Sequence, residues 1–597
     1  MVNIVNKQAS RKMYRNTFIN VLIVSIFQAI LAAVASTVDG ICIGNFVGTE
    51  KAMAAYGIAT TGTILVLIFN AFLSIGTQVI YTQKLSKGVG EKANQILMNM
   101  LVLSIAIGII FVFLGLFANE GLAYIFGARG IEHEELKQWA ADYIKYFYIG
   151  APFLFTESIL FSVVYLDGDR LLAILSVVLS IANNVIGDIV STKILNFGMS
   201  GVACATSISA VVGMVVLFLH FFKKGSSSKL RIYKFDFKEM KNCFIAGMPV
   251  ASKYLMIFGR SVLIEYILLW IGGEDAASAY GIVLNVSNII DAVAIGCLTA
   301  TLILSGVYYG EENEDALNHL LYMIYKMVLY VMLALTVFVF FMSPVFLDLY
   351  SSNLSESARD LSLFALRLNA FTVPFATITS SFVAYFQGCK MPKQSMIATL
   401  LNSFVFPLVC VLVFGVIFHA KGLFIGFLLG YCLYPIVYFS FLFIKNKKVP
   451  RTARETFLFD KDFGYKEEDT IEFSINGIND ALSVSKPVLE FCERHNIDKR
   501  RANHLSACVE EMANLIVLSG FSRSKRNKHC SLRILYKNNK LVLRVRDDCE
   551  KFNIKDKVDR YHQKDETINF AIRIVLNLSN SVEYSHILKT NNLIITI

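Results

Sequence analysis

Four polar side chains lie within or just after long apolar segments in the first half of the chain. Asp39 follows the apolar run 17–38, and Thr206 lies in a later run. Asn184 and Asp188 are four residues apart, so they share one face of a helix. Charged groups are costly in lipid, and we expect these side chains to face the protein interior or a wet cavity. Their carboxylate, amide and hydroxyl oxygens could bind Na⁺, or the two carboxylates could share a proton.

The same residues also permit a structural interpretation. Asp39 could be a cap at the membrane interface, and Asn184 and Asp188 could be a hydrogen-bonded pair with no ion. The second half of the chain is less regular. There, Glu265 or Asp291 could attract a cationic substrate, although pairing of Glu265 with Arg260 is an equal alternative.

The last quarter of the chain carries a different kind of candidate site. Glu510 and Asn514 form an E-x-x-x-N pattern on an expected helix, and Asp547 ends an expected strand. Such residues could orient a water molecule, bind Mg²⁺ and recognise a base. The pattern alone is weak, since Glu510 and Glu511 could be a solvated helix face. The 11 cysteines include no C-x-x-C pair, which argues against a structural zinc site.

Long apolar segments must position most of these residues. The chain has 597 residues, of which 55% are hydrophobic and only 17% charged, too apolar a composition for a soluble protein of this size. Segments of about 20 residues or more are long enough to cross a bilayer as helices. Twelve such segments are expected, near 17–38, 53–82, 94–117, 138–166, 171–193, 200–222, 244–270, 277–307, 318–343, 359–386, 394–418 and 421–444.

The twelve segments form two similar groups of six. AAYGI at 54–58 recurs as SAYGI at 278–282, and DGDR at 167–170 matches QGCK at 387–390. A parallel repeat of this kind is typical of transporters, which place a substrate cavity between the two halves. A passive channel is more often built from several chains around a pore.

The loop charges predict the orientation of the chain in the membrane. Basic residues cluster at 84–92, 223–241 and 445–454, whereas 132–135 (EHEE) and 274–275 (ED) are acidic. The positive-inside rule places the basic loops and both termini in the cytoplasm. Much of the net charge of +10 is therefore explained by topology, and we expect no nucleic-acid partner.

Residues 10–445 resemble the multidrug and toxic compound extrusion (MATE) family. The resemblance is carried by 38–93, with VDGICIGN and GTQVIYTQKLSKG, and by 167–206, with NNVIGD and GMSGVACAT. It implies two six-helix lobes around a central cavity and export of organic, often cationic compounds against Na⁺ or H⁺. It also implies that Asp39, Asn184, Asp188 and Thr206 bind the coupling cation. The glutamate that some Na⁺-coupled members carry does not align with Glu265.

Residues 466–597 are similar to histidine-kinase-type ATPase domains, in particular the anti-sigma-factor kinases. The order of strands and helices and the residues Glu510, Asn514 and Asp547 carry this resemblance. Two glycine-rich boxes of that family are missing, because 547–551 reads DDCEK and 565–571 reads DETINFA. Those glycines let the backbone approach a nucleotide, so we expect a domain that does not hydrolyse ATP and regulates or docks instead.

The sequence therefore predicts an α-helical membrane protein with a C-terminal α+β domain. Its expected parts are an N-lobe (1–222), an inter-lobe loop (223–243), a C-lobe (244–445), a linker (446–465) and a C-terminal domain (466–597). We expect a cation-coupled exporter of the bacterial plasma membrane, not an enzyme, with no cofactor beyond the coupling ion. Its partners would be a small organic substrate, membrane lipid and a cytosolic protein that contacts the C-terminal domain.

Three alternatives remain open at this stage. The membrane part could sense a ligand without net transport and signal through the C-terminal domain. A lipid-linked sugar flippase would need a basic cavity, for which the C-lobe offers Lys253 and Arg260. Finally, the C-terminal domain could be an active protein kinase, which the missing glycines disfavour.

Overall fold

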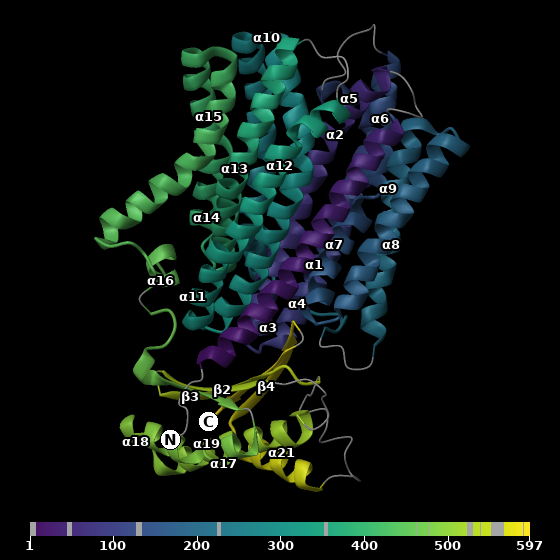
Figure 1. Cartoon of the computed structure of the whole chain (residues 1–597). Coiled ribbons are helices and arrows are strands. Elements are labelled where there is room, and N and C mark those ends of the chain that lie inside the picture. Colours follow the sequence, from purple (N-terminus) through teal and green to yellow (C-terminus); the bar gives the residue numbers. More distant parts are fainter. Residues whose placement is uncertain are drawn as a thin grey trace.

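A bundle of long helices forms the larger part of the molecule, and a small α+β unit lies against one end of it (Figure 1). The computed structural model describes residues 7–43, 50–126, 134–223, 228–350, 356–460, 462–475, 477–521, 529–537, 539–550, 566–588 and 590–597.

The first lobe consists of helices that are apolar on nearly all sides, as expected for segments surrounded by lipid and other helices. Short π-helical turns interrupt two of them. The helices are α1 (Lys7–Cys42), α2 (Glu50–Asn70), η2 (Ala71–Ile75), α3 (Gly76–Ser86), α4 (Gly90–Phe117), α5 (Asn119–Phe126), α6 (Glu134–Ile149), α7 (Ala151–Leu166), α8 (Arg170–Ile189), η4 (Val190–Ile194), α9 (Gly198–Phe218) and η5 (Leu219–Phe222).

The second lobe contains two very long helical stretches, each broken at one residue. In α10, Gly273 has φ 66° and ψ −161°, a conformation essentially limited to glycine. In α15, His419 has φ 54° and ψ −142°. The elements are α10 (Phe237–Gly310), α11 (Glu314–Met323), η6 (Ile324–Val328), α12 (Leu329–Tyr350), α13 (Glu356–Gly388), α14 (Pro392–Leu400), η7 (Leu401–Val405) and α15 (Phe406–Asn446).

Among the residues that the structure describes, nine helices are long and apolar enough to cross a membrane. A tenth is added if Lys137–Ile149 and Ala151–Leu166, which meet at 46°, count as one bent span. This number is lower than the twelve expected from the sequence, partly because Pro392–Asn446 is one continuous helical stretch across His419.

The C-terminal domain is a five-stranded antiparallel sheet with helices on one face. The strand order is β1-β2-β3-β5-β4, and every neighbouring pair is antiparallel. Its elements are η8 (Glu467–Asp469), β1 (Thr470–Ile475), α17 (Ile478–Leu482), α18 (Ser485–Arg494), α19 (Lys499–Leu515), η9 (Ile516–Phe521), β2 (Cys530–Lys537), β3 (Lys540–Asp547), α21 (Glu566–Leu578), β4 (Ser581–Ile587) and β5 (Thr590–Thr596).

Most of the elements expected in this domain are present. The strand alternation at 530–537 and 540–547 gives β2 and β3, which pair from Cys530 opposite Asp547 to Lys537 opposite Lys540. The helix expected at 479–494 is instead two helices, α17 and α18. Strand β4 was not expected, because SVEYSHI has few of the apolar residues that mark a strand.

Separate hydrophobic cores support the bundle and the C-terminal domain. The linker is part of the bundle's core rather than a free tether. Phe457, in the short helix α16 (Ala453–Phe457), stacks on Tyr385 of α13 with 3.9 Å between ring centroids. Phe463 stacks on Tyr309 of α10 at 4.6 Å. The linker therefore fixes the C-terminal domain to the second lobe.

Candidate functional site

The four polar residues of the first lobe come together from three helices. Asp39 lies on α1, Asn184 and Asp188 on α8, and Thr206 on α9. Asn184 Nδ2 donates a hydrogen bond of 3.2 Å to Thr206 Oγ1. Asp39, Asn184 and Asp188 are 8%, 4% and 0% exposed, so the cluster is closed off from bulk solvent. The expected grouping of these four residues is present.

The two carboxyl groups of this cluster lie within hydrogen-bonding reach of each other, yet most of their oxygens have no donor among the described residues. Asp39 and Asp188 are close enough to interact electrostatically. Asp39 Oδ1 and both Asp188 carboxyl oxygens are buried with no hydrogen-bond partner among the residues described. Unpaired buried carboxylate oxygens carry a large desolvation cost. A bound Na⁺ or a proton would remove this cost, and the oxygen-rich set of side chains fits a hard monovalent cation.

Two tyrosines next to the cluster were not anticipated from the sequence. Tyr56 of α2 and Tyr143 of α6 contact edge to face, with ring centroids 5.6 Å apart. Tyr143 is buried and interacts electrostatically with both Asp39 and Asp188. Isolated aromatic residues on apolar helices are usually packing residues, so their sequence positions gave no signal.

The helix that carries Asp188 changes its winding directly after the cluster. The π-helical turn η4 (Val190–Ile194) follows, and Thr192 Oγ1 donates a hydrogen bond of 2.5 Å to the Asp188 carbonyl oxygen. π-Helical turns cost stability and frequently occur at functional sites. Here the altered winding begins at Val190, two residues after Asp188.

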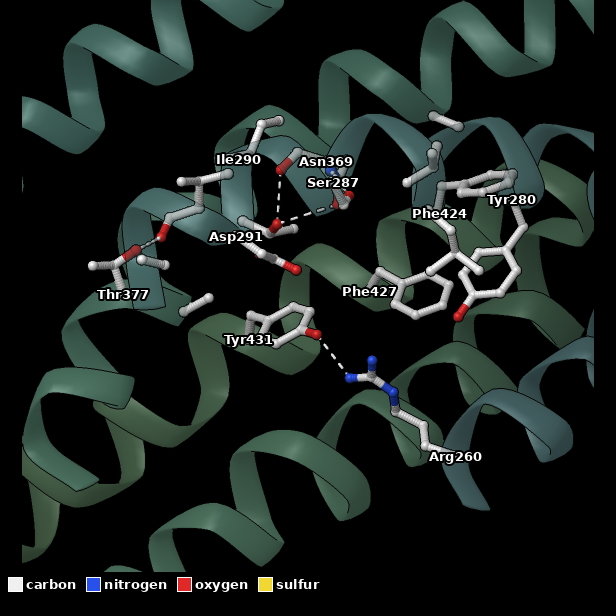
Figure 2. A pocket seen from close by; sticks show the side chains of 17 residues that line it. Arg260, Tyr280, Ser287, Ile290, Asp291, Asn369, Thr377, Phe424, Phe427 and Tyr431 are labelled. Atoms are coloured by element: carbon white, nitrogen blue, oxygen red, sulfur yellow. Dashed lines mark hydrogen bonds between the residues drawn. The ribbon is translucent and has the colours of Figure 1, made fainter. Parts of the chain in front are cut away.

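A cavity of about 90 Å³ lies in the second lobe between α10, α13 and α15 (Figure 2). Arg260 Nη1 donates a hydrogen bond of 2.7 Å to Tyr431 Oη, and its guanidinium lies near the face of that ring. Tyr280 and Phe427 stack with centroids 5.4 Å apart and form an aromatic wall. The cavity therefore combines a cation with aromatic surface.

Asp291 is the acidic residue of this cavity. It lines the space across from Arg260 in Figure 2, and it interacts electrostatically with Lys253 and Arg260. Asn369 Nδ2 donates to Ser287 Oγ at 2.8 Å on the same wall. Asp291 thus lines a cavity of the second lobe, and its contact with substrate stays a prediction. The Glu265 side chain is outside the described part of the structure, and Arg260 pairs with Tyr431.

Two of the residues predicted to contact a nucleotide, Glu510 and Asp547, form hydrogen bonds with other residues of the C-terminal domain. Glu510 Oε2 accepts a hydrogen bond of 2.6 Å from Ser485 Oγ. Asp547 Oδ1 accepts from Asn591 Nδ2 at 2.8 Å and from the Cys549 amide at 2.9 Å.

Burial raises the pKa of Asp547 to about 6, and its exposed fraction is only 6%. Asn514 lies one turn beyond Glu510 on α19. The segment 551–565, which includes the start of DETINFA, is outside the described residues. Asp547 acts here as part of the hydrogen bonding between β3 and β5, which is a structural role. Among the described residues, no group of three or more His, Cys, Asp or Glu side chains could hold a metal ion.

Comparison with known proteins agrees with the architecture of the bundle. The MatE family profile matches residues 25–190 and 249–412, which together exceed half of the chain. The multidrug export protein MepA of Staphylococcus saprophyticus is 21% identical over 320 residues, which cover 53% of this chain and 68% of MepA. MepA of Staphylococcus aureus is 24% identical over 194 residues, covering 32% of this chain and 42% of that protein.

Solved structures show the same fold. An outward-facing multidrug resistance MATE transporter of the MOP superfamily superposes with a TM-score of 0.67 and 22% identity, covering 73% of this chain and 96% of that one. A MOP superfamily transporter from Pyrococcus furiosus, described as having a binding pocket of reverse polarity, gives 0.66 at the same identity and coverage.

One matched segment falls in each lobe, and the long apolar helices make this a multi-pass membrane protein. Members of the matched family are secondary transporters and not enzymes. The chain belongs to the MatE family.

Proposed function

We propose that this protein is a cation-coupled antiporter that exports organic, cationic or amphipathic compounds across the bacterial plasma membrane. The carrying observation is the buried pair Asp39 and Asp188, two carboxyl groups within hydrogen-bonding reach of each other that need a shared proton or a bound cation. Na⁺ or H⁺ bound there would interact with α1 and α8 together, so its binding would favour one arrangement of the first lobe over another. A ligand shifts a conformational equilibrium only through such differential binding.

The proposal includes twelve spans and a cytoplasmic C-terminal domain. If α10 is divided at Gly273, and the continuous stretch Pro392–Asn446 at His419, each half is long enough for a separate crossing. Both helix breaks would then lie on the side of the membrane that carries the acidic loops. The basic loops would lie on the opposite, cytoplasmic side together with the C-terminal domain. The C-terminal domain would regulate transport. Asp547 already accepts hydrogen bonds from Asn591 and the Cys549 amide, which supports a role without nucleotide hydrolysis.

The test is substrate transport by the purified protein in proteoliposomes. An imposed Na⁺ gradient and an imposed proton gradient are applied separately, with a fluorescent organic cation as the substrate. Accumulation of the dye that depends on one of the two gradients, and that is lost when this gradient is dissipated, supports antiport. Binding of the dye without accumulation under either gradient would instead support a membrane sensor that signals through the C-terminal domain.

A second candidate function is favoured by the charge of the second-lobe cavity. Arg260 and Asp291 line this cavity, and Lys253, which is outside the lining, adds a second cation near enough to interact with Asp291. Such a site suits an anionic or zwitterionic group, as in a lipid-linked sugar, better than a simple organic cation. One solved relative is itself described by the reversed polarity of its pocket. Competition between anionic and cationic compounds in the same proteoliposomes separates the two candidates.

A further inference from the structure

The sheet of the C-terminal domain has two faces of different character. Leu543 and Val545 of β3 point into the core of the domain, under its helices. Arg544 and Arg546 alternate with them and therefore point to the opposite face. Figure 1 shows the sheet between these helices and the end of the bundle. The arginine-bearing face of the sheet is thus the one turned toward the two lobes.

Arg546 binds the second lobe. Its Nη1 atom lies 3.0 Å from Glu311 Oε2, directly after the end of α10, and the two side chains are only 10% and 6% exposed. The guanidinium also lies 5.8 Å from the ring centroid of Tyr308. A buried, hydrogen-bonded ion pair of this kind is costly to break by removing one partner, because the other charge stays buried.

Arg544, two residues earlier on the same strand, binds the first lobe. Its Nη1 atom donates a hydrogen bond of 3.2 Å to the carbonyl oxygen of Ser86, the last residue of α3. The turn after α3 lies so close to the C-terminal domain that it leaves no space for a side chain at Gly88. A Cβ at Gly88, where φ is +80°, would lie 2.5 Å from Glu583 Oε2 and 2.8 Å from Ile594 Cδ1.

The turn between β4 and β5 adds a second attachment to the first lobe. The Leu588 amide donates a hydrogen bond of 2.9 Å to the Leu166 carbonyl oxygen at the end of α7. Arg170, at the start of α8, donates from Nη2 to the Leu588 carbonyl oxygen at 3.3 Å. The C-terminal domain therefore binds both helices that flank the loop 167–169.

The two lobes touch each other at the same place. Gln83 Nε2 of α3 donates a hydrogen bond of 2.8 Å to the Gly388 carbonyl oxygen of α13. A Cβ at Gly310 would overlap the Ser86 side chain, so this side chain of α3 packs directly on the backbone of α10. Ser86 and Glu311, the partners of the two arginines, thus lie on either side of the closed contact between the lobes.

We propose that Arg544 and Arg546 of β3 form a latch that joins the two lobes and holds the bundle shut at its C-terminal-domain end. The latch rests on the transport cycle proposed above, in which the lobes must separate at each end in turn. Because one arginine binds each lobe, the lobes cannot part at this end while both contacts persist. Undocking of the sheet is then a required step of each cycle, and any cytosolic partner that favours undocking would increase turnover.

The experiment measures distances in the full-length protein by double electron–electron resonance. One spin-label pair reports the gap between the lobes, through cysteines introduced at the exposed positions Lys92 and Gln394. A second pair reports docking, through Lys92 and the exposed Glu493 of α18. Labelled protein without introduced cysteines gives the background, since Cys204 and Cys432 are partly accessible.

The latch variants are Arg544→Ala, Arg546→Ala, their combination, and Glu311→Gln, which acts from the second lobe. Arg500→Ala is the matched control, because Arg500 is an exposed arginine on the helical face of the same domain. In the latch variants we expect both label pairs to gain a longer component, largest in the double variant. In the control, both distributions should match those of the unmodified protein.

Two results would overturn the latch. In the first, the docking distance lengthens and the distance between the lobes does not. In the second, the double variant leaves both distances unchanged although circular dichroism shows a native fold. Neither readout needs a substrate or a gradient. Failure of gradient-driven transport in the unmodified protein would therefore reject the proposed antiport without changing the outcome for the latch.

Discussion

Asp39 on α1 and Asp188 on α8 place two buried carboxyl groups close enough to interact, yet leave three of their four oxygens without a hydrogen-bond partner among the described residues. Such an arrangement is destabilising unless a cation or proton is present. It connects the position of α1 to that of α8, so occupancy of the cluster and the conformation of the first lobe should change together.

Replacement of either carboxylate by its amide should abolish gradient-driven efflux. Asp39→Asn and Asp188→Asn keep the shape of the side chain but remove the negative charge that the coupling ion requires. Transport in proteoliposomes is the measurement, and Asp348→Asn is the control, because Asp348 is an exposed aspartate paired with Arg359. Unaltered transport by Asp188→Asn would show that coupling resides elsewhere.

Thr206→Val should weaken coupling without eliminating it. Valine preserves the volume but leaves the Asn184 amide without the hydroxyl partner it has at 3.2 Å. The loss of one hydrogen bond of about 1 kcal/mol corresponds to a rise of roughly fivefold in the cation concentration for half-maximal transport. Ser200→Ala is the control, because this half-buried serine of the same helix donates to the Phe197 carbonyl oxygen and not to the cluster; it should leave this concentration unchanged. An equal rise in both variants would contradict the assignment.

Opposite substrate preferences should follow from the two charges of the second-lobe cavity. Arg260→Gln removes the cation that binds Tyr431, and it should reduce transport of anionic compounds more than of cationic ones. Asp291→Asn should do the reverse. The measurement is the ratio of initial rates for a matched anionic and cationic dye. If both variants lower the two rates equally, the cavity has only a structural role.

No ATP binding is expected for the full-length protein. Asp547, which would recognise adenine, already accepts hydrogen bonds from Asn591 and from the Cys549 amide. Glu510 is likewise bonded to Ser485. Titration calorimetry with ATP and Mg²⁺ on the detergent-solubilised protein is the measurement. Heat that saturates at micromolar ATP, and that disappears in Glu510→Gln, would show that the domain binds nucleotide despite the lost glycines.

The buried carboxyl of Asp547 should make the C-terminal domain less stable as pH rises. Its folded-state pKa is raised to about 6 from 3.8, so between these values the folded state binds a proton that the unfolded state has lost. Stability therefore falls across this window and stays low above it. Asp547→Asn should be stabilising at pH 7, by at most about 3 kcal/mol, and nearly neutral at pH 4. Hydrogen exchange of the β3 and β5 amides measures this.

The sequence predicted the local features that depend on spacing and composition. The four-residue spacing of Asn184 and Asp188 placed them on one face, and the alternation in β2 and β3 predicted both strands. It did not predict contacts made by single residues distant in sequence. Tyr143 approaches the carboxylates only because α6 packs on α2 and α9, and Arg546 meets Glu311 only after the whole C-terminal domain has docked.

The linker makes the docking of the C-terminal domain an intramolecular equilibrium. Phe457 and Phe463 keep the chain packed on the second lobe, so an undocked sheet remains within reach of Ser86 and Leu166 on the first. Short tethers of this kind give effective concentrations on the order of millimolar. A cytosolic protein present at micromolar levels can displace the sheet only if it binds that face about a thousandfold more tightly than the lobes do. Partner affinity, rather than partner abundance, would then set the fraction of transporters released.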